Sequence, residues 1–297
     1  MPNSITLAQQ FVPILDEVYK NASLTSKLDG AMELVRQGAN ANELIIPMLS
    51  MDGLGDYSRG GGYVSGDVTL TNQTVKCNYD RGRIFNVDSM DNQETANIAF
   101  GRLAGEFIRT KVVPELDAFR FASYVSAQTA PNVSANLAAG ADVIQALRTG
   151  ITQMDEFEVP LEDRHLFITP TLHGLIQDMD TTKSKEVLAR FASITDVPQT
   201  RFYTAIDLLD GTTEGETTGG YKKATDAGDI NFMIIHKPAV IQFEKHVAPK
   251  IITPDQNQNA DAYKYGYRTV GIAKCYANKS AGIYSHVKQN QKPNQGG

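Results

Sequence analysis

The residue types that most often perform chemistry occur in this chain without the spacing that catalytic motifs require. The glycine-rich residues 52–62 lack both the Lys-Ser or Lys-Thr pair of a phosphate-binding P-loop and the G-x-G-x-x-G spacing of a dinucleotide site. Asp178-Met-Asp180 has the D-x-D form with which some transferases bind a metal, but so short a motif often arises by chance. We therefore expect hairpin flexibility at the glycines and no metal at the aspartates.

Histidine and cysteine patterns lead to the same expectation. No two histidines are four residues apart, the spacing that puts two metal ligands on one helix face; the five are His165, His173, His236, His246 and His286. Neither G-x-S-x-G nor H-E-x-x-H occurs. Cys77 and Cys275 form no C-x-x-C pair and are expected to be reduced thiols. The sequence predicts no catalytic residue, no metal and no cofactor, and therefore a protein that is not an enzyme.

Composition limits the partners of the chain. The 28 basic and 34 acidic side chains give a formal charge of −6, with a pI near 5.4, whereas a domain that grips DNA normally has a basic face. With 41% apolar and 21% charged residues the chain is an ordinary globular mixture. No apolar run approaches the roughly 18–20 residues of a membrane span, and the N-terminus lacks signal-peptide character. We expect synthesis in the cytoplasm and no membrane partner.

The first 42 residues have the pattern of an amphipathic arm. Thr6 and Gln9 have capping-box spacing, and apolar residues follow at helical intervals around Pro13. A weaker helical pattern continues through residues 21–42 and is interrupted by Gly30 and Gly38. Such an arm needs an apolar surface to lie on, in its own domain or in a neighbouring chain.

Residues 43–88 alternate between apolar and polar side chains on either side of the glycine-rich centre, which predicts a long β-hairpin. Arms of 15 or more residues would reach roughly 50 Å, and a two-stranded hairpin is marginal alone in water. We therefore expect it to be stabilised by another subunit. Tyr57 and Arg59 at its tip are the candidate intersubunit contacts. Arg81 and Arg83 are further candidates, since they could touch an acidic neighbour or equally be solvated at a strand end.

A long helix is expected next, from a cap at Asp91 and Glu94 to about Tyr124, with a kink at Pro114. At 1.5 Å per residue it would span roughly 50 Å and act as a spine. The remainder alternates between helices and strands, and the class is α+β. Helices are expected at 141–157, 171–178 and 184–193; strands at 166–170, 232–235, 239–243, 263–275 and 282–287; and a loop at 210–228.

Four long phrases of the sequence resemble one group of tailed-phage major capsid proteins. They are residues 50–59 (Ser-Met-Asp-Gly-Leu-Gly-Asp-Tyr-Ser-Arg), 95–121, 232–246 and 261–268. The order of hairpin, kinked spine helix, central domain and strand-rich end also resembles the capsid fold of phage Hong Kong 97. The likeness covers the chain to about Lys288.

The resemblance implies a structural subunit that builds hexamers and pentamers of an icosahedral head around double-stranded DNA, held without sequence-specific binding. It implies a virion location, with portal, scaffolding and decoration proteins as further partners. It also implies a division of the chain: an N-terminal arm (1–42), an extended β-hairpin loop (43–88), a peripheral domain with the spine helix (89–135 and 236–290), an axial domain (136–235) and a flexible tail (291–297).

The sequence departs from some relatives in two respects. No N-terminal scaffolding extension precedes the arm, so scaffolding is expected to be a separate protein or not to be needed. Some relatives join a loop lysine to an asparagine of a neighbour, but no lysine lies between Asn42 and Val75. Two alternatives stay open: an encapsulin-like compartment around a cargo enzyme, and a hydrolase or transferase, which would need a cluster of perturbed carboxylates or a histidine pair in a pocket.

Overall fold

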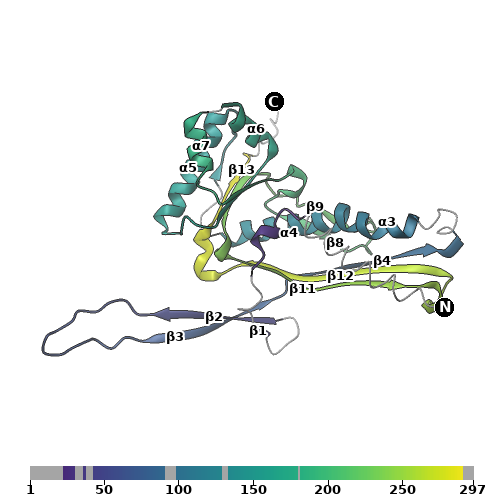
Figure 1. Ribbon diagram of the computed structural model, residues 1–297, viewed down its shortest axis with the longest axis horizontal. Helices are drawn as coiled ribbons and strands as arrows, with labels where there is room; N and C mark the ends of the chain where they lie inside the picture. The colour runs from purple at the N-terminus through teal and green to yellow at the C-terminus, as the bar shows by residue number, and fades with distance from the viewer. Residues whose placement is uncertain are drawn as a thin grey trace, which may run out of the picture.

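The computed structural model describes residues 23–30, 36–37, 43–90, 98–128, 133–179 and 181–289. Three parts are visible in Figure 1: a lobe of sheet and helices, a long narrow sheet with a helix along it, and a two-stranded hairpin that projects away from both. The expected arm helix of residues 6–19, the helix cap at Asp91 and Glu94, and the flexible tail 291–297 lie outside the described residues.

The lobe is built on a five-stranded sheet. Its central strands are antiparallel and buried along their whole length, which explains the continuous apolar run at residues 232–235. The edge strands pair in parallel. In spatial order the strands are β5 (Val133–Ser134), β13 (Ile283–Val287), β10 (Ile230–His236), β6 (Arg164–Ile168) and β7 (Ser193–Asp196).

Both faces of this sheet are covered. Three helices pack on one face, α5 (Gly140–Glu156), α6 (Pro170–Met179) and α7 (Thr182–Leu188), and the apolar side of α5 joins Leu166, Phe232 and Ile234 in one core. The other face meets α4 (Val113–Ala127), where Phe121 lies between Phe167 and Phe202. Alternate residues of β6 and β10 therefore belong to two different cores, as the period of two of a strand requires.

The long sheet and the spine helix form the second part. The sheet order is β11 (Val240–Ile252), β12 (Ala262–Cys275) and β4 (Tyr79–Asp88), all antiparallel. The spine consists of α3 (Ile98–Phe107), the π-helical segment η3 (Ile108–Val112) and α4, and it runs beside these strands in Figure 1. Spine and sheet share a core that contains Leu116, Tyr265 and Tyr267. The expected kink at Pro114 is preceded by the π-helical turn, in which the Val113 N–H donates to Ile108 O.

The projecting hairpin pairs β2 (Glu43–Met51) with β3 (Val68–Lys76) in a continuous antiparallel register, and β1 (Arg36–Gln37) adds a short third strand. The expectation that its second arm continues to Val87 is wrong, because residues 79–88 form β4 and pair with β12. Asn78 explains the break. Its side-chain amide donates to Ala273 O at 2.9 Å and accepts from Ala273 N at 3.0 Å, so the chain joins the long sheet there.

Other local expectations also change. Where residues 21–42 are described, they form the 3₁₀ turn η1 (Ser26–Leu28) and strand β1. Side-chain contacts with the spine hold residues 23–25, and pairing with β2 holds β1. Residues 184–193 contain the end of α7 and the start of β7, and the expected loop 210–228 contains β9 (Gly220–Lys223), which pairs with β8 (Ile206–Leu209). The remaining short turns are η4 (Gln199–Arg201), η5 (Lys237–Ala239), η6 (Pro254–Gln256) and η7 (Ala277–Gly282).

The division into peripheral and axial domains stays a prediction. Strand pairing does place β13 in the lobe sheet beside β10, although residues 236–290 were assigned to the peripheral domain with the long sheet.

Candidate assembly surfaces

The tip of the β2–β3 hairpin is the largest exposed apolar feature among the described residues. Seven side chains of the hairpin, each at least 60% exposed, form what we call the hairpin patch: Met51, Leu54, Tyr57, Tyr63, Val64, Val68 and Leu70. Soluble monomers rarely leave so many apolar side chains together in water. The patch is therefore a candidate surface for association.

The tip has a defined conformation. Ser58 and Gly62 exchange backbone hydrogen bonds at 2.8 and 3.3 Å, and the Ser58 hydroxyl accepts from Gly61 N at 2.7 Å. Gly62 has a φ of 76°, which a residue with a side chain adopts only at a cost. The Tyr57 and Tyr63 rings lie 4.9 Å apart across this turn. The glycines thus permit a tight turn that presents two aromatic rings, which differs from the flexible tip that the sequence suggests.

The predicted contact residues fall into two groups. Tyr57 and Arg59 are both exposed at the tip, 60% in the case of Tyr57, and their contact with a neighbouring subunit stays a prediction. Arg81 and Arg83 lie on β4 and bind their own chain. The Arg81 guanidinium pairs with Glu115 at 2.7 Å and donates to Leu209 O and Gly220 O.

Arg83 donates to Thr217 O and Thr218 O, each at 3.1 Å. Together the two arginines hold the β8–β9 loop against the long sheet and the spine. Arg81 thus pairs with an acidic residue of its own chain and Arg83 is exposed on β4, and whether either arginine also touches a neighbouring subunit stays a prediction. A cavity of about 640 Å³ lies at this junction, lined in part by Phe85, Phe107 and Tyr267.

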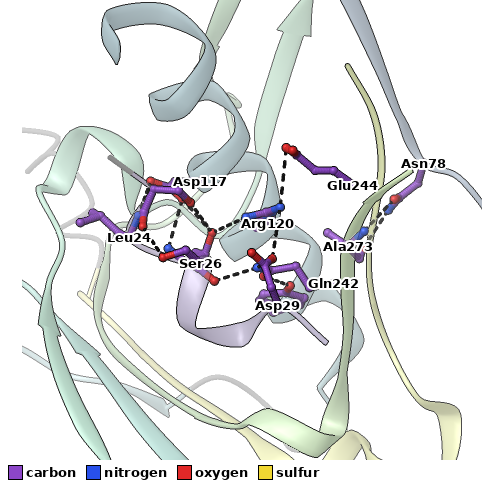
Figure 2. A network of polar contacts seen from close by, with 12 residues as sticks. Leu24, Ser26, Asp29, Asn78, Asp117, Arg120, Gln242, Glu244 and Ala273 are labelled. Carbon is purple, nitrogen blue, oxygen red and sulfur yellow. Dashed lines mark hydrogen bonds and ion pairs between the residues drawn. The ribbon is translucent and has the colours of Figure 1, made fainter. Parts of the chain in front are cut away.

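Residues 23–29, which belong to the predicted N-terminal arm, are fixed to the spine by a buried polar network (Figure 2). Asp117 on α4 has no exposed surface. Its carboxylate accepts from Ser23 Oγ at 2.9 Å, Leu24 N at 3.1 Å, and Thr25 N and Oγ1 at 3.3 and 2.7 Å. Arg201 Nη1 lies 3.4 Å from the same carboxylate. A buried charge is stable only when its oxygens are paired in this way.

Arg120, one helical turn further on α4, completes the network. It donates to Thr25 Oγ1 at 2.8 Å and lies 3.7 Å from Asp29 and 4.0 Å from Glu244. Gln242 on β11 donates to Thr25 O and to Asp29 Oδ1 (Figure 2). The position of residues 23–29 is therefore set by three separate elements of the chain, α4, η4 and β11. Sequence reasoning missed this network; its one signal was a pair of charged residues within the apolar pattern of the spine.

Titratable groups in the lobe are structural in character. Burial lowers the pKa of His165 and His236, and that of His286 to about 4. Their partners are neutral: His165 contacts Ser193 Oγ at 2.7 Å, and His286 contacts Asn231 at 3.0 Å. Burial also raises the pKa of the Cys275 thiol to about 11. In the described residues no three acidic, histidine or cysteine side chains gather as a metal site would require, and no helix there could cross a bilayer.

Comparison with known proteins identifies the fold. No protein-family model and no curated protein matches the sequence. Solved structures do match. The asymmetric unit of the bacteriophage PhiM1 mature capsid has a TM-score of 0.59 at 14% identity, over 86% of this chain and 85% of that one.

A Gordonia phage Cozz structure has a TM-score of 0.59 at 12% identity, over 91% and 87% of the two chains. The capsid structure of cyanophage P-SCSP1u has a TM-score of 0.54 at 11% identity, over 86% of each. The long hairpin, the kinked spine and the helix-covered sheet thus belong to a shared architecture. The chain has the capsid fold of tailed bacteriophages, the Hong Kong 97 type that its sequence resembles.

Proposed function

We propose that this chain is the major capsid protein of a tailed phage, which assembles into hexamers and pentamers of an icosahedral head around double-stranded DNA. The observation that supports this most is the hairpin patch at the end of a projecting two-stranded ribbon. In a monomer such a ribbon has little to stabilise it. In a ring of subunits each hairpin can lie on its neighbour.

The free energies of burial and association favour assembly through many contacts per subunit. Burying each large apolar side chain of the patch contributes about 1.5–3 kcal/mol, so half of the patch gives on the order of 5–10 kcal/mol. Association costs about 4–15 kcal/mol in lost freedom and ordering. A single contact between two subunits is therefore weak. When subunits form a closed ring through two unlike surfaces, the contact that closes the ring forms within one assembly, at high effective concentration, and this stabilises the whole ring.

The charge of the chain supports the role proposed for DNA. A formal charge of −6 is unsuited to phosphate binding, so we propose that the shell encloses DNA without recognising its sequence. Portal, scaffolding and decoration proteins are the further partners we propose, with the virion as location. An encapsulin-like compartment is not favoured, because the structures named above all come from phages.

Size-exclusion chromatography with light scattering tests assembly of the purified protein across a range of concentrations. We expect species near 160 and 195 kDa, five and six times the subunit mass of 32.5 kDa, or larger shells. A strictly monomeric protein at every concentration would refute the proposal.

A further inference from the structure

A groove runs along the solvent face of α5. One wall is formed by α5 itself, and the other by Met179 at the end of α6 and by residues 181–183, the N-cap and first residues of α7. Its volume is about 1100 Å³. Among its described lining residues, Ala141 and Met179 give it apolar surface. Arg148 and Lys183 bring two positive charges against one negative charge, that of Glu156. Neither basic side chain forms an ion pair with another described residue.

A second feature of the same lobe has the complementary character. In the turn of residues 157–163, which follows α5, Phe157 is 53% exposed and Leu161 is 54% exposed. Glu158, Glu162 and Asp163 are exposed in the same turn, so it has three negative charges and no positive one. Two apolar side chains surrounded by acids match a groove with apolar and basic surface.

The turn is held in one conformation before any partner arrives. Arg164, 1% exposed, donates through Nε to Pro160 O at 2.8 Å and through Nη2 to Val159 O, and its Nη1 lies 2.7 Å from the Asp155 carboxylate. Glu158 and Asp163 both have a φ of 57°, the left-handed conformation that side chains disfavour. A fixed turn loses little conformational entropy on binding. Phe157 and Leu161 stay exposed in this conformation, and no residue of the turn lines the groove of its own subunit.

We propose that the turn 157–163 of one subunit docks into the α5–α7 groove of the next subunit around the ring. This inference rests on the proposed function and names one of its interfaces. Unlike surfaces meet, so the contact repeats head to tail and closes by rotation. Phe157 and Leu161 bury apolar surface against Ala141 and Met179, while Glu158 and Glu162 face Arg148 and Lys183.

Charge reversal tests the pairing. The turn variant is Glu158→Lys with Glu162→Lys, and the groove variant is Arg148→Glu with Lys183→Glu. All four positions are exposed, so the subunits should keep their melting temperatures. We expect each variant to lose at least ten-fold in ring yield. Combining all four changes in one chain should restore the yield. The matched control, Glu214→Lys with Asp226→Lys, changes charge equally at exposed positions elsewhere and should assemble normally.

Mixing the turn variant with the groove variant gives a sharper test. When turn-variant and groove-variant subunits alternate around a ring, every basic surface meets an acidic one. Strict alternation is possible in a hexamer but not in a pentamer, which has an odd number of subunits, so hexamers should form again and pentamers should not. The docking inference is wrong, and the proposed function stands, if the wild type assembles and both variants assemble equally well. The same holds if the wild type assembles and the chain with all four substitutions still fails to form rings. If the wild type never assembles, the proposed function itself fails.

Discussion

Asp117 and Arg120 show how single residues fix the geometry of the subunit. Both lie on the spine helix, where the surrounding side chains are apolar and buried. Together they satisfy the backbone and hydroxyl groups of residues 23–25, which would otherwise have no regular secondary structure to pair with. The network thus fixes residues 23–25 against the spine.

The first prediction concerns Asp117→Asn. The amide nitrogen would replace one carboxylate oxygen. Either Leu24 N, which donates to Oδ2, or Ser23 Oγ and Thr25 Oγ1, which donate to Oδ1, would then face a donor, so we expect a loss of about 2–4 kcal/mol in the free energy of unfolding. Urea unfolding of dissociated subunits measures this loss. Asp207→Asn, on an exposed residue, is the control and should stay within about 0.5 kcal/mol. Equal stability of the two variants would mean that the network does not hold the segment.

The second prediction is a pH dependence from the buried histidines. Because burial lowers the pKa of His286 to about 4, the unfolded chain, with a pKa near 6.5, binds the proton first as the pH falls. This contribution to stability is therefore complete above about pH 6.5 and is lost as the pH falls toward 4, and His165 and His236 act in the same direction.

Urea midpoints of the dissociated subunit between pH 7.5 and 4.5 measure this dependence. His286→Gln, which keeps a polar group near Asn231, should flatten the curve. An identical slope in the variant and the wild type would contradict the assignment to His286.

At the scale of elements, the β2–β3 hairpin is the part of the capsid fold through which we propose that subunits contact one another. Its base is anchored, since Val75 is buried with Ile241, Phe243 and Ile272, while its tip contacts nothing but itself among the described residues. Loss of the tip should therefore spare the subunit.

The third prediction replaces residues 52–66 with an Asn-Gly turn, which suits a two-residue hairpin. We expect the melting temperature of the subunit to change by only a few degrees, because no core residue is removed, while the yield of shells collapses. A matched variant, Tyr57→Ser with Tyr63→Ser, removes only the ring pair and should reduce the yield less. Normal shells from the shortened hairpin would show that it makes no essential contact.

Sequence patterns located most elements, and the exceptions have physical causes. The helix expected at 141–157 and the strand expected at 263–275 match α5 and β12 within two residues, because each has a strong local periodicity. The pairing of β4 with β12 was not predictable, since its alternation is compatible with a hairpin as well as with a distant partner. The π-helical turn depends on packing around the spine, and the Asp117 network joins residues more than 90 positions apart.

At the scale of the whole molecule, the stability of a shell must come from many noncovalent contacts. The hairpin has no lysine between Asn42 and Val75, and Arg59 at its tip cannot form an amide bond with a neighbouring asparagine. The fourth prediction is that mature shells dissociate in hot detergent to a single band near 32.5 kDa. A ladder of heavier bands that resists reducing agent would show that another lysine, with Lys76 the first candidate, forms a cross-link.

Electron cryomicroscopy of the purified, concentrated protein tests the central claim most directly. We predict closed particles whose capsomers have five-fold and six-fold symmetry, with the β2–β3 hairpin of each subunit lying on an adjacent subunit and the hairpin patch covered. Particles or monomers in which the hairpin folds back on its own subunit, with the patch buried within one chain, would contradict the account.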